Sequence, residues 1–229
     1  MSAKALVVLA DGFEDVEAVT AIDVLRRGGV EVVTAALAGG PEVRSAHGVT
    51  MLADGFEDVE AVTAIDVLRR GGVEVVTASL SGVREVRSAH GVTMLADAGF
   101  AEAEKDDFDA IVLPGGGEGT ENLKASAALA ARLRRQKDED RLLCAICAAP
   151  TVLVEAGVLE EGQHVTCYPT CSIDLDRPCA GVPVVQDGNV ITGQAPGSSM
   201  LFALVVLKAL ADEKVAMKVA RGLVTDVLD

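Results

Sequence analysis

Aromatic residues are scarce in this chain of 229 residues, which has no tryptophan, one tyrosine and five phenylalanines. Half of the residues are nevertheless hydrophobic. The core must therefore be built from valine, leucine, alanine and isoleucine. This composition suits buried parallel strands that pack against helices with small side chains.

Basic residues are also few. Lys and Arg number 20 against 35 acidic residues, and the net charge of −15 argues against a nucleic-acid partner, whose phosphates would be repelled. No run of about 18 apolar residues occurs, so we expect no membrane span. The N-terminal apolar run is short and leads into acidic residues, unlike a secretory signal. We therefore expect a cytoplasmic protein whose five cysteines are mostly reduced.

One segment of the chain occurs twice. Residues 10–54 and 53–97 are identical at 41 of 45 positions, with a period of 43 residues. Two copies are too few to indicate a solenoid. We interpret them as a tandem duplication, 10–53 and 53–96, inside a single domain that spans residues 1–229. Any functional residue of this segment therefore exists twice.

Short apolar runs alternate with segments of helical periodicity. This alternation predicts a three-layer α/β domain with a mainly parallel sheet, to which the duplication adds a second helix-strand-hairpin segment. In the first copy we predict a strand at Lys4–Ala10, a helix at Val16–Arg27, a strand at Val30–Ala35 and a hairpin at Glu42–Leu52. Later we predict strands at Asp109–Leu113 and Leu142–Ile146, a hairpin around Asp187-Gly188, and helices at Ala125–Gln136, Ala148–Ala156, Met200–Leu210 and Lys214–Leu223.

Cys147 gives the sharpest chemical signal. It follows an apolar strand and precedes a predicted helix, with the small residues Ala145 and Ala149 two positions away on either side. A strained strand-to-helix turn that presents a nucleophile needs small residues there. The dipole of the following helix is expected to lower the pKa of the thiol and favour the thiolate. The alternative is a small cysteine in the core.

Two further elements accompany this cysteine. The glycines of Leu113–Gly117 can offer backbone amides to an oxyanion, although they also fit a plain loop before a helix. They lack the pattern of a phosphate-binding loop. Acidic residues open the repeated helix, where they either complement the helix dipole or face the cysteine from a neighbouring strand end. These residues are Glu14, Asp15 and Glu17, and in the second copy Glu57, Asp58 and Glu60.

Taken together, the segments LVVLADGFEDVEAVTAIDVLRRGG, DAIVLPGGGEGTENL, AICAAPTVL and GQAPGSSMLFALVVLKAL resemble the DJ-one/ThiJ/PfpI family. The similarity is to the branch of the parkinsonism-associated protein and its bacterial relatives. Without one repeat copy it extends from Lys4 to Val224. The resemblance implies a flavodoxin-like sandwich, a homodimer, and neither a cofactor nor a metal.

The resemblance also implies roles for individual residues. Cys147 matches the reactive, easily oxidised cysteine of the family, and Glu17 matches the glutamate that hydrogen-bonds to it, or Glu60 if the second copy is used. We expect a raised pKa for this carboxyl, because two negative groups in contact are costly. The family residues whose backbone surrounds the thiolate correspond to Gly115, Gly116 and Ala148 of this chain. The family residues that line or shape the pocket correspond to Arg27, Pro196 and Gly197.

The implied activities are cofactor-independent conversion of methylglyoxal to lactate and removal of early glycation adducts. The expected partner is therefore a small reactive carbonyl compound or a glycated protein. In both reactions the Cys147 thiolate adds to a carbonyl carbon and the glutamate moves a proton. The alternative is a non-enzymatic redox sensor or chaperone of the oxidative-stress response, which uses the same cysteine as a sulfinate.

A hydrolase of the amidotransferase or protease type ranks lower. Tyr168 stands where some family members carry a histidine, which argues against a Cys–His dyad, and the nearby His164 is expected at the surface. The His-x-Glu sequence expected of an amidotransferase is absent.

The sequence leaves open which copy supplies the glutamate. We favour Glu17, because Lys4–Ala10 runs directly into the first copy, whereas Val49–Ala53 would have to imitate that strand to deliver Glu60. The surplus copy is expected to be disordered, to pack on the sheet edge or to be swapped with a partner subunit.

The remaining cysteines offer further alternatives. Cys144 and Cys147, with Cys167 and Cys171, approach the spacing of a zinc site, but the apolar surroundings favour Cys144 as a core thiol. Cys167, Cys171 and Cys179 are candidates for oxidation.

Overall fold

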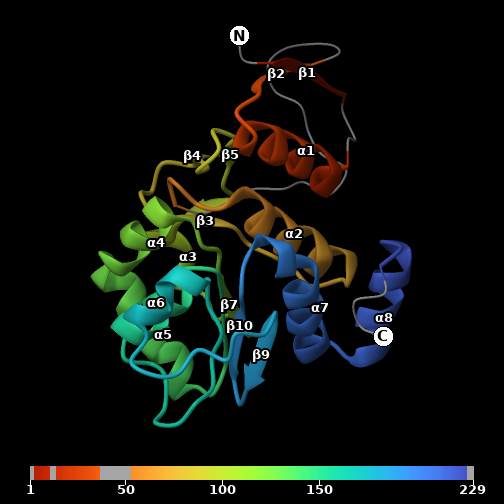
Figure 1. Ribbon diagram of the computed structural model, residues 1–229. Helices are drawn as coiled ribbons and strands as arrows, with labels where there is room; N and C mark the ends of the chain where they lie inside the picture. The colour runs from red at the N-terminus through yellow and green to blue at the C-terminus, as the bar shows by residue number, and fades with distance from the viewer. Residues whose placement is uncertain (1–2, 11–13, 37–52, 226–229) are drawn as a thin grey trace.

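The computed structural model of the chain describes residues 3–10, 14–36 and 53–225. Helices cover both faces of a central sheet, so the predicted three-layer arrangement is confirmed (Figure 1). The strand order is β7-β8-β10-β9, and only the edge strand β9 is antiparallel. These strands are β7 (Ala110–Leu113), β8 (Leu142–Ile146), β9 (Val184–Asp187) and β10 (Val190–Gly193).

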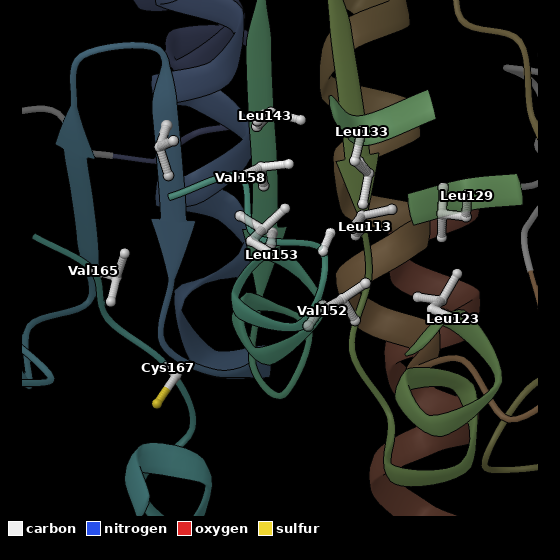
Figure 2. Packing of buried hydrophobic residues seen from close by; sticks show 14 of the residues in the cluster. Leu113, Leu123, Leu129, Leu133, Leu143, Val152, Leu153, Val158, Val165 and Cys167 are labelled. Atoms are coloured by element: carbon white, nitrogen blue, oxygen red, sulfur yellow. The ribbon is translucent and has the colours of Figure 1, made fainter. Parts of the chain in front are cut away.

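Two aliphatic cores lie on the two faces of this sheet. The first packs Leu133, Leu143 and Leu153 between the strands and three helices (Figure 2). The second joins Ile146 and Ile191 of the strands to the other helices. The first core involves α4 (Gly117–Lys124), α5 (Ala127–Asp138) and α6 (Pro150–Glu155), and the second involves α2 (Asp58–Arg70), α7 (Ser199–Leu210) and α8 (Glu213–Gly222).

Smaller elements complete the main body. The predicted hairpin of the second copy is present, since β4 and β5 pair in antiparallel fashion on either side of His90-Gly91. The short strands β3 and β6 pair in parallel. These elements are β3 (Ala78–Ser79), β4 (Glu85–Arg87), β5 (Thr93–Leu95), β6 (Ala98–Gly99), α3 (Phe100–Ala103) and the 3-10 turns η1 (Pro169–Asp174) and η2 (Pro196–Ser198).

The first repeat copy forms a separate layer outside α2 (Figure 1). Its described part consists of α1 (Asp15–Arg27) and β2 (Glu31–Ala36). The strand that precedes the copy, β1 (Lys4–Leu9), pairs in parallel with β2. The hairpin predicted at Glu42–Leu52 falls on residues outside those described. Our expectation that the first copy joins the main sheet is therefore wrong, because the second copy packs in the body instead.

The two identical helices α1 and α2 pack antiparallel to each other. Arg27 at the end of α1 pairs with Glu57 before α2, and Arg70 at the end of α2 pairs with Glu14 before α1. Val19 of α1 joins Val62 and Ile65 of α2 in one apolar cluster. The surplus copy thus docks on its own duplicate through reciprocal contacts, rather than on the sheet edge. Within the ranges described, no helix has both the length and the apolar character needed to cross a bilayer.

Candidate active site

Cys147 lies on the strained turn that the sequence predicts. It directly follows β8 and has a φ of +63°, which is uncommon for a residue other than glycine. Its N–H donates to Gly193 O at 3.0 Å, and its carbonyl accepts from Tyr168 N at 2.7 Å. These backbone bonds to neighbouring segments hold the strained conformation in place, and the residue is 8% exposed.

Glu60 of the second copy, and not Glu17, lies beside this cysteine. Glu60 is 1% exposed and its Oε2 accepts a hydrogen bond of 2.8 Å from Gly115 N. Its carboxyl lies against the thiol of Cys147, with which it forms a side-chain hydrogen bond. Glu17 occupies the same position of α1 but is exposed. The placement expected for Glu17 is therefore wrong, because α2 fills the position next to the sheet.

The glycine loop after β7 fits tightly between α2 and Cys147. A Cβ atom on Gly115 would lie 2.7 Å from Cys147 Cβ and 2.8 Å from Glu60 Oε2. Gly116 has a φ of +92°, and a Cβ atom there would lie 2.2 Å from Gly55 O. Glycine is therefore required at both positions. The absence of side chains lets the amides of Gly116 and Ala148 reach the Cys147 thiol as donors.

The carboxyl of Glu60 is held in its neutral form near neutral pH. Burial raises its pKa to about 8, and the charge of Glu57 adds to this effect. The hydrogen bonds from Gly115 and Cys147 act in the opposite direction but are weaker. Its other oxygen, Oε1, is buried without a partner of hydrogen-bonding geometry among the described residues. An ionised carboxylate would be poorly solvated here, so the raised pKa agrees with the expectation from the sequence.

The pKa of Cys147 is raised, contrary to our expectation from the helix dipole. Burial is the main cause, and the charge of Glu60 is the second. The amides of Gly116 and Ala148 lower it, but by less. The helix itself begins only at Pro150 and spans six residues, which limits its dipole at the thiol. Cys147 and Glu60 therefore titrate as a coupled pair. The pair loses its first proton near the raised pKa of Glu60, about 8, and holds the second proton to higher pH.

A polar cluster lies where α1 meets the start of α2. Arg27 pairs with Glu57 and, at 2.7 Å, with Asp23. His90 Nδ1 lies 2.6 Å from Asp23 Oδ1 and 2.9 Å from Asp58 Oδ2. The ligand atoms of the three acids and the histidine lie within 4.8 Å of one another, a spacing that could hold a metal ion. Because Arg27 and His90 already contact these acids, we interpret the cluster as a polar network that docks the helices.

Arg27 therefore reaches the neighbourhood of the site from the docked copy. It contacts Glu57 and lowers the pKa of Glu60 through its charge. Glu57 also supplies the cap of α2, accepting from Glu60 N at 2.9 Å, while its own N–H donates to Gly115 O. From the sequence we name Glu57 only as one of the acidic residues that open the repeated helix, and this capping role is not predicted.

The other residues singled out from the sequence lie further from the thiol. Pro196 and Gly197 form η2, just after Gly193, the acceptor for Cys147 N. His164 is 79% exposed and lies 3.0 Å from Asp187, as expected of a surface residue. Cys144 is fully buried in the core. All five cysteines are free.

A cavity of about 400 Å³ lies between α2 and β7. Ala64, Leu68, Val75 and Ala110 line it together with Pro114. Cys147 is not among the lining residues. We therefore do not assign this cavity to the chemistry of the thiol.

A cysteine on a strained strand-to-helix turn, against a buried carboxyl and backbone amides, defines a class of three-layer α/β proteins by its fold and by the geometry of this thiol-carboxyl pair. Comparison with protein families is more specific. The chain belongs to the DJ-1/PfpI family, whose family model matches residues 3–54 and again 49–209. The double match follows the repeat.

Relatives match almost the whole chain. Protein dj-1beta of Drosophila melanogaster is 39% identical over 97% of each chain, and the Parkinson disease protein 7 homolog of Danio rerio is 36% identical over 96% of each. The crystal structure of Drosophila melanogaster DJ-1beta superposes with a TM-score of 0.72 at 32% identity, covering 98% of this chain and 99% of that one. The flavodoxin-like fold is thereby confirmed.

A second solved structure matches a smaller share of this chain. Toxoplasma gondii DJ-1, in oxidized form, has a TM-score of 0.73 and 34% identity. The match covers 100% of that chain and 78% of this one. The part of this chain outside that match is comparable in length with one repeat copy of 43 residues.

Proposed function

We propose that this protein is a cysteine-dependent glyoxalase or deglycase that acts on methylglyoxal or on early glycation adducts, with a role in the response to oxidative stress. Membership of the DJ-1/PfpI family, which includes glyoxalases and proteases, supports the general class. The observation that carries the proposal is the contact of the buried Glu60 carboxyl with the Cys147 thiol.

The chemistry needs no cofactor. When the pair has lost one proton, the sulfur of Cys147 attacks the aldehyde carbon of methylglyoxal and Glu60 protonates the oxygen, which gives a hemithioacetal. The Glu60 carboxylate then takes the proton from that carbon and returns it to the neighbouring one, while the hydroxyl proton passes to the former ketone oxygen, which leaves a thioester. Water hydrolyses the thioester to lactate and frees the thiol, so methylglyoxal and water account for all atoms of the product.

The amides of Gly116 and Ala148 suit this sequence of steps. They point at the sulfur, where negative charge resides before attack, and lower its pKa. Amide donors fixed before the reaction stabilise such charge without having to reorganise. Tyr168, in the position of the histidine of other members, leaves Glu60 as the proton carrier.

Lactate formation from methylglyoxal without glutathione tests the proposal. We expect turnover by the wild type and none by Cys147→Ser. Turnover that survives in Cys147→Ser would contradict the role of the cysteine. If the wild type is inert while peroxide converts Cys147 to a sulfinate, the sensor or chaperone function replaces the enzymatic one.

The homodimer is a separate proposal. The helix face of α2 is self-complementary, because its duplicate α1 docks on it with reciprocal ion pairs. Such a surface is suited to an isologous contact between two copies of a chain. Sedimentation equilibrium of the whole chain tests this: a dimer requires that α1 be displaced or that another face be used, and a strict monomer contradicts the proposal.

A further inference from the structure

Two other cysteines lie in direct contact near the site. Cys167 Sγ donates a hydrogen bond to Cys179 Sγ across 3.7 Å. Cys167 is fully buried at the end of the core cluster in Figure 2, whereas Cys179 is only partly buried. A small oxidant can therefore reach the second sulfur before the first.

The backbone keeps the two thiols together. Val165 and Cys179 form a parallel bridge, and Ala180 N donates to Val165 O at 2.9 Å. The two segments thus run side by side, although Cys167 and Cys179 are separated by eleven residues in the chain. A sulfur–sulfur bond of about 2.0 Å would require only a local closing of the present 3.7 Å.

The two thiols differ in acidity. Burial raises the pKa of Cys167, and the hydrogen bond it donates to Cys179 adds to this effect. For Cys179 burial also acts to raise the pKa, but the backbone N–H groups of Gly181 and Cys167 and the Cys167 thiol together outweigh it, and the pKa is lowered. Cys179 is therefore the better nucleophile, and Cys167 keeps its proton for a second step.

A metal does not explain this pair. The described ranges include all five cysteines, and the only converging group of metal-ligating side chains found within these ranges is the acid-histidine cluster at Asp23. Cys171 lies nearby, but burial raises the pKa of its thiol, and the hydrogen bond that opposes this effect comes from Thr170 and not from another cysteine. It therefore serves as a matched control.

We propose that Cys167 and Cys179 form a redox pair that closes to a disulfide when the protein meets a hydroperoxide. The Cys179 thiolate attacks one peroxide oxygen, the O–O bond breaks, and the leaving hydroxide is protonated to water, which leaves a sulfenic acid. The sulfur of Cys167 then attacks Cys179. The S–S bond forms, the S–O bond breaks, and the hydroxyl leaves as a second water with the Cys167 proton. Two thiols are oxidised and one hydrogen peroxide is reduced to two waters.

The test uses full-length protein with one equivalent of hydrogen peroxide, followed by alkylation of the remaining thiols and peptide mass spectrometry. It is run on the wild type and on Cys147→Ser, so that oxidation of Cys147 neither hides nor mimics the result. Cleavage before Asp174 and Asp176 separates Cys167 from Cys179. We expect these two peptides to be linked, with the loss of two hydrogen atoms, and to be released by dithiothreitol.

Variants assign the two roles. In Cys167→Ser we expect Cys179 to stop at a sulfenic acid that dimedone traps. In Cys179→Ser we expect Cys167 to stay reduced. Cys171→Ser should form the disulfide at the wild-type rate. The proposal is overturned if both thiols of the wild type remain alkylatable, or if the linkage runs through Cys171. The wild-type result decides the matter even if a variant fails to fold.

Discussion

The carboxyl of Glu60 lies against the thiol of Cys147, and both groups are buried. Burial disfavours the charged form of each, so the pair gives up one proton near the raised pKa of Glu60, about 8, and holds the other tightly. The reactivity of the site should therefore follow the titration of the pair, and not that of an isolated thiol.

Protein stability should depend on the titration of Glu60. Its pKa is raised from 4.5 when unfolded to about 8 when folded. Between these two pH values the folded state therefore binds more protons than the unfolded state. The stability that the neutral Glu60 carboxyl contributes is complete below about pH 4.5 and is lost as the pH rises through about 8. We expect the unfolding free energy of the wild type, relative to Glu60→Gln, to fall over this window by at most about 1.4 kcal/mol per pH unit.

Urea denaturation across this pH range measures the effect. The repeat supplies the control, since Glu17→Gln makes the same change at the exposed position of an identical helix and should cause no such dependence. A difference between the wild type and Glu60→Gln that is constant with pH would show that the carboxyl titrates normally.

The glycine loop gives a second matched comparison. Gly115→Ala would place a Cβ atom 2.7 Å from Cys147 Cβ and 2.8 Å from Glu60 Oε2. We expect it to destabilise the protein by about 1–3 kcal/mol and to reduce the reactivity of Cys147, because both groups must move. Gly117→Ala meets no atom within 4 Å and should stay within about 0.5 kcal/mol of the wild type. Equal effects of the two substitutions would contradict the tight fit.

The two ion pairs that dock α1 on α2 should contribute unequally to protein stability, although the same two residue types form both. Arg27 pairs with Glu57, whose side chain is 4% exposed, whereas Arg70 pairs with Glu14, whose side chain is 29% exposed. Arg27→Ala leaves a buried carboxylate without its partner, so we expect it to destabilise the protein by about 1–2 kcal/mol more than Arg70→Ala does.

Arg27→Ala should also act on the site. Loss of the positive charge of Arg27 removes one influence that lowers the pKa of Glu60, so that pKa should rise further. The pH dependence of Cys147 alkylation would then move upward in Arg27→Ala and stay unchanged in Arg70→Ala. An unchanged profile in both variants would mean that the docked copy does not influence the site.

The strained turn at Cys147 could be predicted from sequence because its constraints are local. Small residues around Cys147 and glycines after a strand determine a strained turn whatever lies further away. The acidity of the thiol could not be predicted in the same way. It depends on burial and on Glu60, which belongs to a distant segment, and these outweigh the contribution of a helix of six residues.

The choice between Glu17 and Glu60 could not be made from sequence at all. Both lie in the same thirteen-residue helix sequence, with identical caps and flanks. The strand after each helix behaves likewise: EVVTA forms part of β2 at 31–35, where β1 pairs with it, but at 74–78 only Ala78 is in a strand. Tertiary partners, and not local propensity, decide the environment of each copy.

The most direct test of the site is the rate at which iodoacetamide alkylates Cys147 between about pH 6 and pH 10, followed by peptide mass spectrometry. The wild type and Glu17→Gln should show the same rise near pH 8, the raised pKa of Glu60. In Glu60→Gln the rise should move to higher pH, because burial still holds the thiol pKa above 9.0 and no carboxylate accepts its proton. A shifted profile in Glu17→Gln, with Glu60→Gln unchanged, would contradict the assignment of the second copy to the site.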